Sequence, residues 1–358
     1  MIRKSRSQVV SWSFHPLTVR LKDYWTIALQ AFRILAVLLL AVLGSWSCSP
    51  GPGSDPTKLE RLTIAAVPTE LNGMVYVAED QNLFARNGLR VTLKDYDSGA
   101  TAAAGMLNAE ADVALAAEFP IVRQIFNKKD IISFGTITKY ENTYIVWRAD
   151  SGIKTIQDLK GKRIGVTLHT ISEFYLGRTL ELNGMSIQQV TLVDTRAPES
   201  EKALLDGKVD AVAMWEPWVT QISQRMGKQG ITRALQAGQY AYWNLVSTTG
   251  WTKKHSNLLG RLMKSMVQAD NYIASHPDEA KAVVRKRMKF DETYVEIIWP
   301  RYQFALSLDQ SLITAMEDEA RWMIRNNMTT AKKVPEFVNY IHADALKAIK
   351  PEAVNIIR

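Results

Sequence analysis

The sequence predicts an α/β protein of two lobes, each a doubly wound sheet with helices on both faces. Strand-like and helix-like segments alternate through the middle of the chain, which is typical of parallel strands joined by helical crossovers. The same order of elements occurs twice, which favours a structural duplication. The 358 residues, 47% hydrophobic and 22% charged, are enough for two domains with buried cores.

Residues 1–47 are predicted to be a signal peptide rather than part of the fold. Six Lys and Arg residues and one acidic residue accompany the apolar run ILAVLLLAVLG, residues 34–44. A basic region followed by such a run is typical of an export signal, and the run is shorter than the roughly 20 residues that span a membrane. An uncleaved anchor over residues 25–46 is the alternative, which Gln30 and Arg33 disfavour.

Cys48 is the only cysteine of the chain, and it opens a linker rich in Pro, Gly and Ser over residues 48–58. This position is typical of a lipoprotein, in which the cysteine is lipidated after signal cleavage, although Ser45 and Trp46 depart from the usual motif. A free cysteine is the alternative. One cysteine permits neither a disulfide framework nor a cysteine metal site.

The net charge of +8 comes mostly from the predicted signal. Without residues 1–47 the chain has 38 Lys and Arg residues against 35 Asp and Glu residues, a net charge of +3. The main argument for nucleic-acid binding is therefore lost, and we expect no nucleic-acid partner.

The first copy of the repeated pattern runs from residue 61 to residue 120. RLTIAAV, residues 61–67, predicts a buried strand, and the next segment predicts an amphipathic helix over residues 74–88 that ends at a glycine. RVTLKDY predicts a second strand. A further helix leads to the third strand, within ADVALAAEFP, residues 111–120.

The second copy begins at KRIGV, residues 162–166. A helix ending at Gly184, the strand QVTLVDT and the third strand within VDAVAMWEP follow in the same order. Both third strands begin after an aspartate and end at a glutamate: Asp112 and Asp210 are 98 residues apart, as are the two glutamates, Glu118 and Glu216. The matched order and spacing predict two lobes with the same topology.

Helical periodicity dominates the chain from residue 252 almost to its end. Four helices are expected, over residues 258–275, 276–288, 308–327 and 334–349, and they would pack on the first lobe. The expected boundaries are a first lobe over residues 59–147 and 246–358 and a second lobe over residues 148–245. The crossovers would lie near Trp147 and Trp243.

A cleft between the lobes is the predicted binding site. In sheets of this kind ligands bind at the carboxyl ends of the strands, and small ligands prefer clefts between domains. Glu118 and Phe119 would lie at this edge of the first lobe, and Trp215 and Glu216 at that of the second. The alternative is that Trp215 covers a core while Glu216 faces solvent.

Two predicted helix starts face the same cleft. Ser98, Gly99 and Thr101 open one helix, and Thr170 and Ser172 open another. Their N–H groups and hydroxyls would hold an anion. Plain N-capping is the alternative.

The chain lacks the motifs of an enzyme or a metal protein. HExxH, CxxC, GxSxG and P-loop patterns are absent, and the histidines are scattered. His169 alone lies on a predicted cleft loop. We therefore expect no catalysis, no cofactor and no metal.

Several segments resemble a known family, the periplasmic substrate-binding proteins of ATP-driven importers, in the nitrate, sulfonate and taurine group related to the yeast pyrimidine-synthesis proteins. The resemblance covers residues 60–255 well and the tail loosely. The matching segments are VAEDQNLFARNGLRVTL, DLKGKRIGV, LELNGMSIQQVTLV and ALLDGKVDAVAMWEPW.

The resemblance implies a type II periplasmic-binding fold, in which two lobes on a two-strand hinge close on a small solute. It also implies an extracytoplasmic protein, tethered by the lipid anchor, that delivers the solute to an ABC permease and its ATPase. The cleft positions it implies are Pro68, Thr69, Ser98 to Thr101, Glu118 to Pro120, Thr170 to Ser172 and Trp215 to Pro217.

Two other functions stay open at this point. A binding protein for a pyrimidine or other heterocyclic precursor would use Glu118 and Glu216 to accept from ring amines and Trp215 to stack. An enzyme of the pyrimidine-synthesis type would share the fold, but the cysteine-rich signature of such enzymes is absent.

Overall fold

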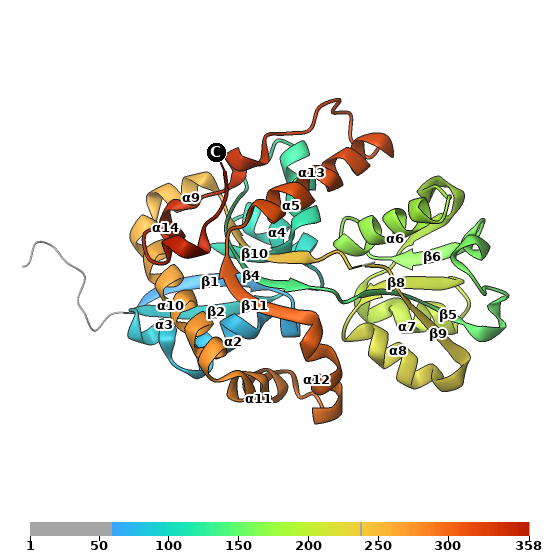
Figure 1. Ribbon diagram of the computed structural model, residues 1–358, viewed down its shortest axis with the longest axis horizontal. Coiled ribbons are helices and arrows are strands. Elements are labelled where there is room, and N and C mark those ends of the chain that lie inside the picture. Colours follow the sequence, from blue (N-terminus) through green and yellow to red (C-terminus); the bar gives the residue numbers. More distant parts are fainter. Residues whose placement is uncertain (1–58, 237, 358) are drawn as a thin grey trace, which may run out of the picture. The chain divides into compact units, whose positions relative to one another are not determined.

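Two mixed sheets form the framework of the molecule (Figure 1). The computed structural model describes residues 59–236 and 238–357. The predicted signal peptide and Cys48 lie outside these residues. Among the described residues, no helix is both long enough and apolar enough to cross a bilayer.

The first sheet has the strand order β11-β4-β10-β3-β1-β2. Its strands are β1 (Glu60–Ala66), β2 (Leu89–Asp95), β3 (Val113–Ala117), β4 (Ile132–Tyr140), β10 (Ala241–Ser247) and β11 (Tyr302–Ser307). The strand β1 runs parallel to β2 and β3, whereas β10 and β11 pair antiparallel with β4. Every residue of β3 is buried, as expected for a strand covered by helices on both faces. We call this sheet and its helices lobe 1.

The second sheet has the order β7-β6-β8-β5-β9. Its strands are β5 (Thr143–Arg148), β6 (Arg163–Val166), β7 (Thr191–Asp194), β8 (Ala211–Trp215) and β9 (Gly230–Ala234). The strand β6 runs parallel to β7 and β8, and β5 runs antiparallel to β8 and β9. We call this sheet and its helices lobe 2.

The helices account for most of the remaining chain. They are α2 (Gly73–Asp80), α3 (Leu83–Arg86), α4 (Gly99–Leu107), α5 (Glu118–Phe126), α6 (Ile171–Leu182), α7 (Ser200–Leu205), α8 (Trp218–Met226), α9 (Thr249–Lys254), α10 (Ser256–Ser275), α11 (Pro277–Met288), α12 (Glu292–Ile298), α13 (Gln310–Arg325) and α14 (Asp344–Lys347). In lobe 1, α10 and α11 pack against α2, and α13 packs against α5.

The predicted duplication is present in the structure and gives the two aspartates the same role. Asp112 precedes β3 and accepts a hydrogen bond from the Thr63 N–H of β1 at 2.8 Å. Asp210 precedes β8 and accepts one from the Arg163 N–H of β6, also at 2.8 Å. Each carboxylate therefore joins the first and third strands of its own lobe.

Three sequence predictions about elements are wrong. The helix expected over residues 74–88 is broken into α2 and α3, because Asn82 adopts a left-handed conformation with φ of 54°, which asparagine tolerates better than most residues. The expected helical tail contains the strand β11. Residues 334–349 form only a 3-10 turn, η8 (Phe337–Tyr340), and the short helix α14.

The chain crosses between the sheets earlier than expected. It leaves β4 of lobe 1 at Tyr140 and enters β5 of lobe 2 at Thr143. Residues 143–148, which include Trp147, therefore belong to the second sheet. It returns between β9 and β10, so Trp243 already lies in lobe 1. The apolar run through β4 and β5 reads as strand throughout, and apolar patterning does not show which sheet each part joins.

Gln236 joins the two crossovers. Its Oε1 accepts hydrogen bonds from the Asn142 and Thr143 N–H groups at 2.7 and 2.8 Å, and its Nε2 donates to the Tyr140 carbonyl at 3.0 Å. One buried side chain thus fixes the two connecting segments to each other, beside the expected cleft.

Candidate ligand-binding cleft

A small cavity lies where the two lobes meet the first crossover. Its volume is about 30 Å³, which is room for one or two water molecules. Lobe 1, the first crossover and lobe 2 all line it, with these residues: Val67, Thr69, Leu71, Gly99, Ala117, Pro120, Tyr140, Asn142, Thr170, Ile171, Trp215 and Trp243. We call it the cleft cavity.

The parallel strands bring these residues together. Thr69 follows β1, Ala117 ends β3, and Thr170 and Trp215 stand after β6 and at the end of β8. All are at carboxyl ends, which is where the fold predicts a site. Of the sequence-predicted positions, these line the cleft cavity: Thr69, Gly99, Pro120, Thr170, Ile171 and Trp215.

Gly99 lines the cavity at a point where the Ala116 backbone and the Trp243 ring leave little room for a larger residue. A Cβ there would lie 3.1 Å from the Ala116 Cα and 3.2 Å from the Trp243 ring. Ser98 and Thr101 do not line the cavity. They form a capping box, in which the Thr101 N–H donates to Ser98 Oγ at 3.2 Å and the Ser98 N–H donates to Thr101 Oγ1 at 3.1 Å.

The start of α6 shows the same division. Thr170 lines the cavity, and its hydroxyl donates to the Thr167 carbonyl at 2.7 Å. His169 lies outside it, with a φ of 69° and a ring nitrogen 3.3 Å from Arg123 of lobe 1. Ser172 is buried, and its hydroxyl has no partner within the described part of the chain.

Glu118 and Phe119 are placed behind the cavity wall. Phe119 belongs to an aromatic cluster, 5.8 Å from Phe174 and 5.9 Å from Trp322 between ring centroids. Glu118 is buried and accepts a hydrogen bond from the Tyr242 N–H of β10 at 2.8 Å. Burial raises the pKa of Glu118 to about 8. Sequence alone could not foresee this contact, because its partner is 124 residues away.

Trp215 and Glu216 have different roles. Trp215 lines the cavity, whereas Glu216 turns away and accepts a hydrogen bond from the Thr220 N–H in the first turn of α8, at 3.1 Å. The peptide bond from Glu216 to Pro217 is cis. Burial is the main cause that raises the pKa of Glu216.

Acidic side chains stand close behind the cavity on the lobe 1 side as well. Glu70 follows Thr69, is fully buried, and accepts a hydrogen bond from the Tyr302 hydroxyl at 2.5 Å. Burial, with a smaller contribution from the Glu216 charge, raises the pKa of Glu70 to about 7. Among the described residues, no Lys or Arg lines the cleft cavity.

Pro68 lies in a neighbouring pocket rather than in the cleft cavity. That pocket has a volume of about 270 Å³, and its polar lining includes Asn72, Asp95 and Arg287.

Six lining residues were missed by the sequence analysis: Val67, Leu71, Ala117, Tyr140, Asn142 and Trp243. Tyr140 ends β4, Asn142 lies in the first crossover, and Trp243 belongs to the strand that follows the second. The misplaced crossovers hid Tyr140, Asn142 and Trp243. Had the crossovers been located, their position in a hinged cleft would have pointed to these residues.

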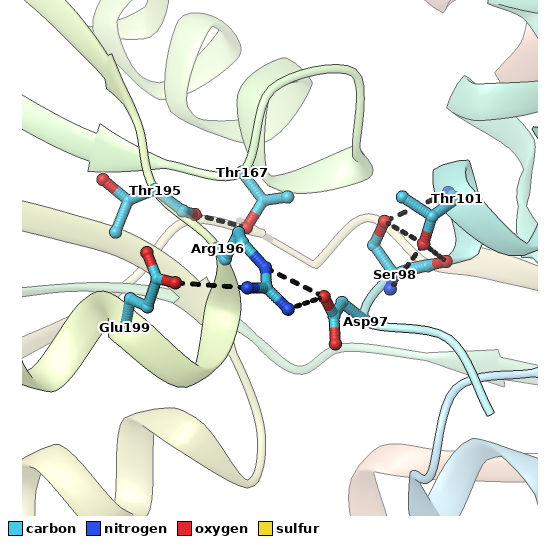
Figure 2. Close-up of polar contacts among 7 residues, drawn as sticks. All are labelled: Asp97, Ser98, Thr101, Thr167, Thr195, Arg196 and Glu199. Atoms are coloured by element: carbon cyan, nitrogen blue, oxygen red, sulfur yellow. Dashed lines mark hydrogen bonds and ion pairs between the residues drawn. The ribbon is translucent and has the colours of Figure 1, made fainter.

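An ion pair connects the lobes away from the cavity (Figure 2). Arg196, which follows β7 of lobe 2, donates from Nε to Asp97 Oδ2 of lobe 1 at 2.9 Å. Its Nη1 is 3.3 Å from Glu199. Thr167 in turn donates to the Thr195 carbonyl at 2.7 Å, which supports the loop that carries Arg196.

Comparison with known proteins places this fold in a family. The family described as NMT1/THI5 like matches residues 72–280. The chain belongs to this family. The resemblance predicted from the sequence is thereby confirmed.

Curated relatives of the chain are distant. A putative aliphatic sulfonates-binding protein of Bacillus subtilis is 22% identical, over 74% of this chain and 79% of the relative. The taurine-binding periplasmic protein of Escherichia coli is 25% identical, over 56% of this chain and 63% of the relative.

Solved structures confirm the type II periplasmic-binding fold. The alkanesulfonate-binding protein SsuA from Xanthomonas axonopodis pv. citri, bound to MOPS, is similar with a TM-score of 0.69 and 16% identity, over 80% of this chain and 99% of that one. The desulfurization enzyme DSZB is similar with a TM-score of 0.60 and 15% identity, over 81% of this chain and 98% of the enzyme. The fold therefore occurs in both binding proteins and an enzyme.

Proposed function

We propose that the protein is the extracytoplasmic substrate-binding component of an ABC-type importer. It holds a small solute in the cleft between its lobes and delivers it to a permease and its ATPase. The observation that carries this proposal is the cleft cavity, which receives residues from equivalent strand ends of both lobes and from the first crossover. Such a site fills or empties as the lobes move.

The proposed solute belongs to the nitrate, sulfonate, taurine and bicarbonate class. Two relatives named for aliphatic sulfonates and taurine support this class. The N-termini of α4 and α6, at Gly99 and Ile171, open on the cavity, and backbone N–H groups at helix N-termini hold acidic groups without a cationic side chain.

We propose binding without turnover. The lining of the cleft cavity offers two threonine hydroxyls, Thr69 and Thr170, and no histidine or cysteine. Thr69 Oγ1 donates to Glu70 Oε2 at 3.1 Å, and Thr170 Oγ1 donates to the Thr167 carbonyl at 2.7 Å. Residues 59–358 contain no cysteine at all. The lining therefore holds no pair of a nucleophile and a histidine base.

Export and lipidation at Cys48 complete the proposal. They rest on the basic region, the apolar run of residues 34–44 and the position of the cysteine. Mass spectrometry of the membrane fraction should find a lipid-modified N-terminal Cys48. A soluble protein that retains residues 1–47 would refute this part.

A thermal-shift screen followed by calorimetry tests the binding function. The purified protein is screened against taurine, alkyl sulfonates, nitrate, bicarbonate and aminopyrimidines. We expect at least one member of the proposed class to stabilise the protein and to bind with a one-to-one stoichiometry. Stabilisation by aminopyrimidines alone would instead support a binding protein for heterocyclic precursors.

A further inference from the structure

The main chain of Asn142 is held by the second crossover and by lobe 2. Asn142 lies between β4 and β5, at the first crossover. Its N–H donates to Gln236 Oε1 at 2.7 Å, and its carbonyl accepts from the Glu216 N–H at 3.2 Å. The backbone of Asn142 is therefore fully bonded without any help from its side chain.

The carboxamide of Asn142 has no partner. The residue is 0% exposed and lines the cleft cavity, yet neither Nδ2 nor Oδ1 makes a hydrogen bond to any described residue. A buried polar group that has no hydrogen-bond partner lowers the stability of the folded protein. Within the described residues, the side chain of Asn142 makes no hydrogen bond that would stabilise the fold.

Other buried asparagines near the cleft are fully engaged. Asn72 Nδ2 donates to the Val67 carbonyl at 2.6 Å, and its Oδ1 accepts from Trp243 Nε1 at 2.8 Å. Asn244 Nδ2 donates to the Tyr242 carbonyl, and its Oδ1 accepts from the Thr136 hydroxyl, both at 2.7 Å. Asn142 is the exception among these three.

The surroundings favour a solute that brings a hydrogen-bond donor. Thr69 and Trp215 line the cavity, and each is followed in the chain by an acid, Glu70 and Glu216 respectively. No cationic side chain offsets them among the described lining residues. An N–H group, above all on an amine, is attracted to such a site, whereas a group that only accepts hydrogen bonds leaves Asn142 Oδ1 unpaired.

We propose that Asn142 is a specificity-determining residue that hydrogen-bonds the solute as donor and acceptor at once, so that the solute is an amino-bearing acid rather than a simple anion. This inference rests on the proposed function and narrows its solute class. In the solute complex Nδ2 donates to the acidic group or another acceptor, and Oδ1 accepts from the amino group.

Matched solutes test the inference in calorimetry. Taurine and ethanesulfonate differ by the amino group, and 3-aminopropanesulfonate and propanesulfonate form a second such pair. We expect the wild-type protein to bind the amino-bearing member of a pair at least about tenfold more tightly, which is the affinity ratio of one lost hydrogen bond to a charged group. Asn142→Leu should remove that preference, and Asn142→Ala serves as the smaller substitution.

Stability without solute gives a second, independent readout. Asn142→Leu should raise Tm by on the order of 2–4 °C, because an unpaired buried carboxamide is removed. The matched control is Asn244→Leu, which should lower Tm because it leaves Thr136 and Tyr242 without their partner.

The outcomes separate this inference from the proposed function. A fall in Tm for Asn142→Leu would make the carboxamide structural and overturn the inference. So would equal binding of both members of a pair, or a preference that survives in both Asn142 variants. Binding of nitrate or bicarbonate by the wild-type protein, with none of these four solutes bound, would overturn this inference and leave the proposed solute class standing.

Discussion

At the scale of single residues, the segment from Trp215 to Pro217 places one side chain at the cleft cavity and the next against the first turn of α8. Trp215 lines the cavity, while Glu216 accepts from the Thr220 N–H of α8 and donates its own N–H to the Asn142 carbonyl in the first crossover. The sequence analysis proposed both side chains as ligand contacts. The structure brings only Trp215 to the cavity, and the role of the aromatic ring in binding remains a prediction.

Trp215→Ala should weaken solute binding. Loss of an aromatic contact costs about 0.5–1.5 kcal/mol beyond the loss of buried area, so the dissociation constant measured by calorimetry should rise by roughly tenfold or more. Trp218→Ala is the control, because Trp218 packs on the core of lobe 2 and does not line the cavity. Equal loss of affinity in both variants would show that the effect comes from lobe 2 stability.

The buried carboxyl of Glu118 should make stability depend on pH. Its pKa is raised by burial from 4.5 to about 8, so the folded state binds its proton more tightly than the unfolded state. The resulting stabilisation is fully present below about pH 4.5 and is lost as pH rises toward 8, at up to about 1.4 kcal/mol per pH unit. The pKa of Glu70 is also raised by burial, to about 7, and acts in the same direction.

Urea unfolding at pH 5, 6.5 and 8 measures this dependence. The wild-type free energy of unfolding should fall between the lowest and the highest of these pH values, and Glu118→Gln should flatten the fall. The glutamine keeps an acceptor for the Tyr242 N–H but has no proton to lose. Glu279→Gln, on the exposed first turn of α11, should leave the slope as it is. A steeper fall in the Glu118 variant than in wild type would contradict the assignment.

At the scale of elements, periodicity predicted the parallel strands and most helices correctly. The order from β1 to β3 and from β6 to β8 was readable because each strand is a short apolar run between helical segments. The break at Asn82 and the strand β11 were not readable, since a left-handed residue and a late pairing with β4 leave no mark on the apolar pattern.

The same limit applies to the cleft. The sequence located the helix starts and the strand ends. Whether each side chain there faces the cavity depends on which hydrogen-bond partner it has in the folded protein. Ser98 and Thr101 satisfy each other, and Glu118 finds a partner in β10. Only tertiary contacts decide these cases, so the sequence could name the segments of the site and not all of its side chains.

The ion pair between Asp97 and Arg196 should support closure of the lobes. It joins the loop after β2 to the loop after β7, so it forms only while the lobes lie together. Because both side chains are exposed, the expected coupling is weak and should decrease with salt.

A double-mutant cycle on taurine affinity measures this coupling. Asp97→Ala and Arg196→Ala should each weaken binding slightly, and the double variant should be no weaker than the single ones. Lys202→Ala is the control, since Lys202 forms its ion pair with Asp206 within lobe 2. Strictly additive effects of the two substitutions would show that the pair does not contribute to closure.

At the scale of the whole molecule, the cleft cavity has room for one or two waters, with a volume of about 30 Å³. We expect the lobes to lie further apart around a bound solute than in this structure, and further apart again when the solute enters or leaves. The two crossovers, held together by Gln236, are the segments about which the lobes would turn. Opening, binding and closure are the expected cycle of such a protein.

Small-angle X-ray scattering with and without the solute found by calorimetry tests the central claim, that solute binds between the lobes and closes them. The account predicts that the radius of gyration of the purified protein falls at saturating solute, and that Trp215→Ala needs more solute for the same change. An unchanged radius of gyration at a solute concentration that calorimetry shows to be saturating would contradict it.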